Sequence, residues 1–292
     1  MNPVLPRFTP FGLLHGLMFS AIVVASIGWI VWARNEPDAA RRRRGEEVVA
    51  YANLALWIVI RLYLLTPAQF KWSVWPPLGM CDLMSLLASI KLLNPQSRWP
   101  SIALYFGGVG LCTNALVTPD LQEGPREFEF WAFWLRHAGI LVVAIYDIAV
   151  LGFRPGWRDW RRACVGGLGY IAFVSAINVS LGFNFGFMGN SLPGHPSALD
   201  FLGAWPLRLA WVVMIVGLLW AVMVLPFTMR RRINHPVRSF PSGDRAASGR
   251  RSGTRPSPAT RARRRAGVRT GSRRSATASL SAPRAHADRP DR

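Results

Sequence analysis

Seven long apolar stretches constrain the fold of this chain more than any other feature. Each holds roughly 20 residues, the length of helix that crosses the hydrocarbon core of a bilayer. Backbone N–H and C=O groups find no water there, so each stretch must satisfy its hydrogen bonds internally as a helix. We therefore expect an all-α membrane protein with seven transmembrane helices, at residues 11–33, 48–66, 76–93, 99–117, 128–151, 163–182 and 204–227.

The Lys and Arg residues between these stretches predict how the helices are oriented. Basic residues gather in alternate connections, namely segments 34–47, 91–98 and 152–162 and the run Arg230-Arg231-Arg232 after the last stretch. The first ten residues and the remaining connections carry one basic residue each or none. Basic loops stay in the cytoplasm. We expect a multi-pass protein of the cell membrane with its N terminus outside and its C terminus in the cytoplasm.

Most of the net charge of +20 belongs to the end of the chain and not to a folded binding face. Residues 230–292 contain 18 Arg and 3 Asp in a low-complexity background of Ser, Ala, Gly and Pro. Such a segment buries too little apolar surface to fold. We expect a transmembrane domain at residues 1–228 and a disordered cytoplasmic tail at 229–292. The expected partners of this tail are anionic lipid headgroups, with no specific nucleic acid.

Polar residues inside or beside the apolar stretches crowd toward the predicted outer side. Polar groups in hydrocarbon are costly and tend to mark functional sites. Several at one depth indicate a pocket that opens outward, although each alone is explained as a hydrogen bond between helices. The residues at this depth are His15, Cys81, Asn114, Thr118, Asp120, His137, Asn178 and Asn184.

Cys81 and His137 are the candidates for covalent chemistry. Cys81 lies about five residues into the third stretch and His137 about eight into the fifth, so their depths match. A thiol beside a base can act as a nucleophile, and an imidazole can take its proton. The simpler interpretations are a small buried apolar residue for Cys81 and a packing hydrogen bond for His137. Cys112, in the fourth stretch, is a rival nucleophile or a disulfide partner for Cys81.

The other polar residues receive supporting roles. Asp120, which follows Thr118-Pro119, is a candidate to orient His137 as the third member of a triad. We assign His15, Asn114, Thr118, Asn178 and Asn184 to substrate binding. Arg61 lies near an outer helix end and is expected to snorkel. A metal site formed by His15, His137 and Asp120 has no supporting ligand spacing, so we expect neither metal nor cofactor.

Two function classes remain open from the residues alone. The first is a lipid-modifying enzyme in which Cys81 attacks a lipid ester, giving acyl transfer or hydrolysis. The second is a non-enzymatic transporter or ligand-binding module that uses the same outer pocket. The chain has no internal repeat and no charge at the predicted bilayer centre, which argues mildly against transport.

Several motifs, taken in order, resemble the transmembrane protein 164 family, in its bacterial YwaF-like branch. They are Pro77-Leu78-Gly79-Met80-Cys81-Asp82, Leu116-Val117-Thr118-Pro119-Asp120-Leu121, Leu135-Arg136-His137, residues 181–188 and residues 199–206. The resemblance covers nearly all of residues 8–228. It implies a seven-span membrane protein whose eukaryotic relatives are associated with phospholipid acyl transfer through a cysteine and a histidine. The matching positions here are Cys81 and His137.

Overall fold

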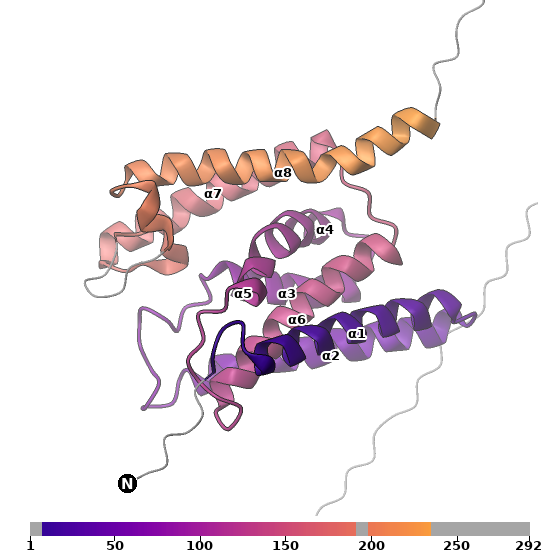
Figure 1. The fold of residues 1–292 in the computed structure, drawn as a ribbon, viewed down its shortest axis with the longest axis horizontal. Coiled ribbons are helices and arrows are strands. Elements are labelled where there is room, and N and C mark those ends of the chain that lie inside the picture. The colour runs from indigo at the N-terminus through magenta and orange to yellow at the C-terminus, as the bar shows by residue number, and fades with distance from the viewer. Residues whose placement is uncertain (1–7, 191–197, 235–292) are drawn as a thin grey trace, which may run out of the picture. The chain divides into compact units, whose positions relative to one another are not determined.

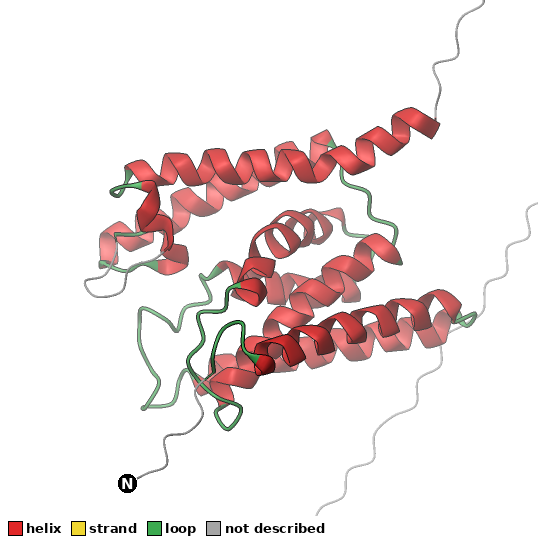
Figure 2. Cartoon of the chain, viewed as in Figure 1, coloured by secondary structure: helices red, strands yellow, loops and turns green. Residues whose placement is uncertain are grey.

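The computed structural model describes residues 8–190 and 198–234, and these form helices and loops without a strand (Figure 2). Residues 229–234, predicted to belong to the disordered tail, are helical, and the rest of that tail, from position 235 onward, lies outside the described residues. Figure 1 labels the α-helices. The α-helices are α1 (Leu13–Asn35), α2 (Ala39–Tyr63), α3 (Met80–Leu93), α4 (Arg98–Ala103), α5 (Thr113–Val117), α6 (Phe128–Ala149), α7 (Trp157–Leu181) and α8 (Leu207–Asn234). A π-helix, η1 (Leu104–Cys112), joins α4 to α5, and η2 (Phe185–Phe187) and η3 (Ala198–Leu202) are short 3-10 helices.

Five helices in the described part of the chain are long and apolar enough to cross a membrane. They are α1, the continuous run Arg98–Val117, α6, α7 and Leu207–Met229 of α8. All seven predicted stretches contain helix, so the all-helical fold class is confirmed. The second and third stretches, which become α2 and α3, do not reach this standard of length and composition.

The start of α3 corrects a predicted boundary. Its 14 residues rise about 21 Å, less than the roughly 30 Å of a bilayer core. The predicted helix at 76–93 begins only at Met80, because prolines at 76 and 77 lack backbone donors and Gly79 is the extended N-cap. Cys81 therefore lies in the first turn of its helix.

The start of α2 corrects a second predicted boundary. The segment 34–47 was expected to be a loop, yet α2 begins at Ala39 and includes Arg41 to Arg44. Asp38 caps this helix by accepting a hydrogen bond from the Ala40 backbone at 2.8 Å. The connection between α1 and α2 is therefore only residues 36–38.

The π-helix η1 lets three other helices approach one segment closely. A Cβ added at Gly107 would meet Met84 of α3, one at Gly108 would meet Ile140 of α6, and one at Gly110 would meet α8. These contacts, at 2.9 to 3.1 Å, are so close that a larger residue would force the neighbouring side chains to move. Short π segments occur frequently at functional sites, and Cys112 is the last residue of this one.

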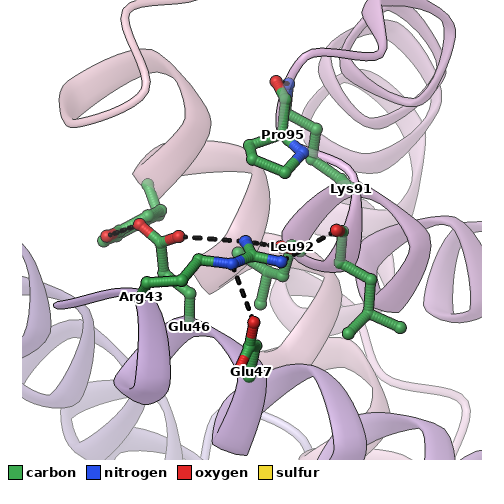
Figure 3. Close-up of polar contacts among 8 residues, drawn as sticks. Arg43, Glu46, Glu47, Lys91, Leu92 and Pro95 are labelled. Carbon is green, nitrogen blue, oxygen red and sulfur yellow. Dashed lines mark hydrogen bonds and ion pairs between the residues drawn. The ribbon is translucent and has the colours of Figure 1, made fainter. Parts of the chain in front are cut away.

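Contacts at both ends of the helices show that α2 runs antiparallel to α3 and α6. The Nη2 atom of Arg61, late in α2, lies 3.0 Å from Asp82 at the start of α3. Arg43, early in α2, donates through Nη2 to the Leu93 carbonyl at the end of α3, at 2.8 Å. Figure 3 shows Arg43 beside Leu92, whose carbonyl accepts from Nη1. The Tyr146 hydroxyl, late in α6, donates to Glu46 at 2.7 Å. We call the end of this bundle that holds Arg61, Asp82 and the neighbouring Cys81 the Cys81 end. The opposite end, which holds Arg43, Glu46 and Leu93, is the Arg43 end.

Helices α1, α7 and α8 expose much of their apolar surface. Val24 of α1, Val165 of α7 and Leu218 of α8 are each more than 65% exposed. In contrast, the inward side chains of α3, η1 and α6 form a shared core with Leu92, Leu104 and Val143 almost completely buried. Large exposed apolar surfaces suit contact with lipid tails.

Candidate active site at the Cys81 end

Cys81 and Cys112 bring two free thiols together. Cys81 is the second residue of α3, Cys112 ends η1, and their Sγ atoms lie 3.5 Å apart. Cys112 is buried and Cys81 is half-buried. The first turn of a helix presents unbonded backbone N–H groups and the positive end of the helix dipole, which favour negative charge on a side chain there. The Cys81 thiol is therefore the better placed of the two to react as a thiolate.

His137 belongs to α6, a helix that packs against α3. The imidazole is 3% exposed, and its Nδ1 lies 2.7 Å from the Phe133 carbonyl oxygen one turn earlier. A carbonyl only accepts, so Nδ1 carries the proton and donates. In the neutral ring, Nε2 is then the acceptor. The helix itself thus holds His137 in the tautomer that a base toward a thiol needs.

Asp82 connects three helices directly beside this pair. Its Oδ1 accepts from Arg61 of α2 at 3.0 Å and from Arg136 of α6 at 2.9 Å. Its carbonyl accepts from the Trp57 indole at 3.1 Å. One carboxylate faces two guanidinium groups, so the cluster has an excess positive charge. Arg61 is not a snorkelling residue, which corrects the prediction, because it turns inward to this carboxylate.

Three donors of the same neighbourhood are buried without a hydrogen-bond partner in the described structure. They are the Nε atoms of Arg61 and Arg136 and the indole nitrogen of Trp75. The Trp75 carbonyl accepts from Arg61 at 2.9 Å, which ties the loop before α3 to this cluster. Buried donors normally find partners, so these three are available to a bound acceptor.

His15, predicted to bind substrate, joins helices instead. Its Nδ1 accepts from the Phe11 backbone at 2.8 Å, and its Nε2 then donates to the Leu116 carbonyl at 2.8 Å. The ring also packs against Phe8 and Trp134. Both ring nitrogens are occupied, so His15 is not free to bind a ligand.

Asn114, Thr118 and Asp120 lie around the end of α5 and are exposed. The Thr118 hydroxyl donates to the Asn114 carbonyl at 3.1 Å, which closes the last turn of the helix. Within the described contacts, nothing joins Asp120 to His137, whose Nδ1 is held by Phe133. The orienting role that the sequence assigned to Asp120 is filled by a backbone carbonyl of α6.

Asn178 and Asn184 organise the loop after α7. The Asn178 side chain is 2% exposed, donates to the Phe185 carbonyl at 3.0 Å and accepts from the Phe185 backbone N–H at 2.8 Å. The Asn184 side chain accepts from Gly189 at 2.9 Å. Both amides therefore serve loop structure, and the predicted substrate-binding set does not converge on Cys81.

Two apolar cavities reach Met80, the first residue of α3. One of about 310 Å³ runs between α3, α4, η1 and α7, and one of about 90 Å³ lies toward α8. Met80 and Tyr170 line both, and the Tyr170 hydroxyl donates to the Leu78 carbonyl at 2.8 Å. Cys81, the residue after Met80, is not among the residues that line either cavity.

The residues that the structure describes contain no group of three or more His, Cys, Asp or Glu side chains placed to hold a metal ion. The alternative of a site formed by His15, His137 and Asp120 therefore has no geometric support. The ring nitrogens of His15 are also already in use.

Comparison with known proteins decides the family. The sequence matches the TMEM164 family over residues 10–224, which is most of the chain. The protein belongs to the TMEM164 family. Neither the curated proteins nor the solved structures gave a match. Membership and the five long apolar helices together fit a multi-pass membrane protein, and the bacterial YwaF-like branch stays a prediction.

Proposed function

We propose that this protein is a lipid acyltransferase or lipid ester hydrolase of the cell membrane that uses Cys81 as nucleophile and His137 as base. In this proposal α2 and α3 complete a seven-span domain, with the N terminus outside and the C terminus in the cytoplasm. The antiparallel run of α2 against α3 and α6 supports this arrangement, as do the alternating basic loops. The Cys81 end then faces outward.

The reaction follows from the two side chains. His137 Nε2 takes the thiol proton, and the Cys81 thiolate forms a bond to the ester carbonyl carbon. The tetrahedral adduct expels the alcohol of the lipid, which takes the proton back from the imidazolium, and leaves an acyl thioester on Cys81. The hydroxyl of a second lipid, or water, then gives its proton to Nε2 and attacks the thioester. The acyl product leaves and the thiol is restored.

The Asp82 cluster supports the proposal through its unpaired charge and donors. Asn114, Asn178 and Asn184, which the sequence assigned to substrate binding, are exposed or already hydrogen-bonded within the chain. Arg136 is next to His137 in sequence and retains a buried Nε without a partner. We assign it the role of stabilising negative charge on the carbonyl oxygen or on a lipid phosphate.

The observation that carries the proposal is the fixed tautomer of His137, together with the contact of its neighbour Arg136 with Asp82, the residue after Cys81. The test uses full-length protein in nanodiscs with a defined phospholipid, followed by mass spectrometry of the intact protein and of the lipids. We expect an acyl adduct on Cys81 and new lipid products from the wild type, and neither from Cys81→Ala. His137→Gln should slow adduct formation about 100-fold or more.

Cys164→Ala is the matched control, because Cys164 is a free thiol in the first half of α7 and has no role in the proposal. Equal product formation by wild type, Cys81→Ala and His137→Gln, at equal protein levels, would refute the enzyme proposal. A membrane-impermeant thiol reagent applied to whole cells tests the orientation, since it should label Cys81 and spare Cys164.

The alternative of a non-enzymatic binding or transport module is supported by the same excess charge at Asp82. It makes an opposite prediction for one variant. Cys81→Ser should retain full ligand binding in a binding module, whereas a thiol-dependent enzyme should lose nearly all turnover. Full biological activity of Cys81→Ser would favour this alternative.

A further inference from the structure

An apolar groove descends from Met80 toward the N-terminal part of α7. Its walls come from α3, α4, η1 and α7, with Trp220 of α8, and Arg162 is its only charged lining residue in the described structure. A Cβ added at Gly166 would meet nothing within 4 Å, so this glycine leaves open space in the wall. Apolar lining residues at successive depths are Leu83, Leu87, Ile102 and Phe106.

The lower end of this groove opens into a basic hollow of about 490 Å³. Arg158, Arg161 and Arg162 line the hollow, and their spacing puts them on one face of α7. Trp99, Arg162 and Gly166 line both the hollow and the groove, so the two spaces adjoin. The Arg162 guanidinium lies over the Trp99 ring, 5.8 Å from its centre.

The carboxylate nearest to these arginines is already committed elsewhere. Asp159 accepts from Arg98 at 2.9 and 2.6 Å and lies 3.9 Å from the Arg162 guanidinium. The three exposed arginines therefore keep most of their charge available to an anion. A phosphate accepts several such donors at once.

We propose that the basic hollow and the groove together bind one anionic phospholipid, with its phosphate at Arg158, Arg161 and Arg162 and one acyl chain in the groove. A phospholipid supplies both parts, whereas a free anion would leave the groove empty. Helix α7 exposes apolar Val165 and Leu168 near the hollow, so a lipid can reach it from the bilayer.

This lipid differs from the substrate of the proposed reaction. Tyr170, near Cys81, lies eight residues after Arg162, which is about 12 Å along the helix. The ester groups of the bound lipid stay near the arginines and away from the thiol. The site therefore stands or falls separately from the activity assigned to Cys81.

The test is native mass spectrometry of the full chain after exchange into vesicles of phosphatidylglycerol and phosphatidylcholine. We expect the wild type to retain phosphatidylglycerol selectively. The Arg158→Gln/Arg161→Gln/Arg162→Gln variant should retain at most about one tenth of that amount. Gly166→Leu should also lower retention, because its side chain fills the groove without changing charge. Leucine suits a helix better than glycine, which favours folding of this variant.

Arg41→Gln/Arg42→Gln/Arg44→Gln is the matched control, because it removes the same charge from α2. Equal loss in this control would show general surface attraction and overturn the proposal. Displacement by inorganic phosphate, with no effect of Gly166→Leu, would show an anion site only and overturn it as well.

A measurement on unmodified protein keeps the proposal testable if the variants fail to fold. A phosphatidylglycerol probe with a photoreactive group in its acyl chain should crosslink to groove residues such as Leu87, Ile102 or Phe106. Crosslinks confined to the exposed faces of α1 and α8 would overturn the proposal.

Discussion

The two ends of the α2–α3–α6 bundle hold ionic clusters that are satisfied in different ways. At the Arg43 end, the Arg43 guanidinium is surrounded by acceptors, namely two glutamates and the last carbonyls of α3 (Figure 3). Lys91 likewise donates to the Pro95 and Ser97 carbonyls and pairs with Asp147 at 3.2 Å. At the Cys81 end, two arginines share one carboxylate and keep buried donors unused.

This difference separates a structural cluster from a candidate binding site. The last carbonyl oxygens of any helix need hydrogen-bond donors from elsewhere, and Arg43 supplies these donors at the end of α3. The unused donors at the Cys81 end, in contrast, have no acceptor within the folded chain that the structure describes. A ligand with negative charge would complete the Cys81 end, whereas the Arg43 guanidinium already has its acceptors within the chain.

The largest difference between the ends is expected from oxidation, because only the Cys81 end brings two thiols together. Diamide accepts the two electrons and two protons as Cys81 and Cys112 form a disulfide. We expect complete loss of lipid turnover, restored by dithiothreitol. Intact mass and peptide mapping detect the disulfide.

Cys112→Ser removes the disulfide partner and should make turnover resistant to diamide, while Cys164→Ala should stay sensitive. Equal sensitivity of the Cys112→Ser variant and the wild type would contradict a role for this thiol pair.

The next largest effect is expected from removing the Asp82 carboxylate at the Cys81 end. Asp82→Ala leaves Arg61 and Arg136 close together without a counter-charge. We expect a loss of about 3 kcal/mol in the free energy of unfolding. Thermal unfolding in detergent measures the shift against the wild type.

Glu46→Gln at the other end is the comparison, because Arg43 retains Glu47 and two carbonyls there. Its cost should be nearer 1 kcal/mol. An equal cost for the two variants would remove the distinction between the two ends.

Arg43→Gln should affect stability and leave chemistry intact. Loss of its bonds to the last carbonyls of α3 should cost about 1 to 2 kcal/mol, with lipid turnover per folded molecule unchanged. The measurement pairs thermal unfolding with turnover normalised to folded protein. A fall in normalised turnover as large as that of His137→Gln would show that the two ends are coupled.

The smallest effect is expected from Asp120→Asn. The carboxylate is exposed and a backbone carbonyl already orients His137. Stability should change by less than about 0.5 kcal/mol, and turnover by less than about twofold. A loss of 100-fold would restore Asp120 as a triad member.

The sequence allowed the helices to be predicted because apolar length is a local property. The late start of α3 also had a local signal, in two prolines and a glycine, and the early start of α2 had one in the Asp38 cap. These signals were outweighed by continuous hydropathy and by the basic run. Boundaries at helix caps are therefore where the prediction was wrong.

Depth along a helix could also be predicted, but rotation about its axis could not. Cys81 and His137 were expected at matching depths, and their pairing stays a prediction, since the contact that the structure gives for the Cys81 thiol is with Cys112. His15 has a similar depth, yet its side chain points toward the Leu116 carbonyl and forms a packing hydrogen bond with it. Arg61 pairs with Asp82 only because α2 packs along α3, and no local pattern encodes that pairing.

The π-helix η1 makes the geometry of the two thiols depend on chain length as well as on side chains. Deleting one residue between positions 104 and 112 would favour ordinary α-helical bonding and shift the register of all that follows. Cys112 would turn by about 100° around the helix axis. The apolar span would keep its composition, but Cys112 would no longer face Cys81. A one-residue change in length can thus separate the thiols without substituting either of them.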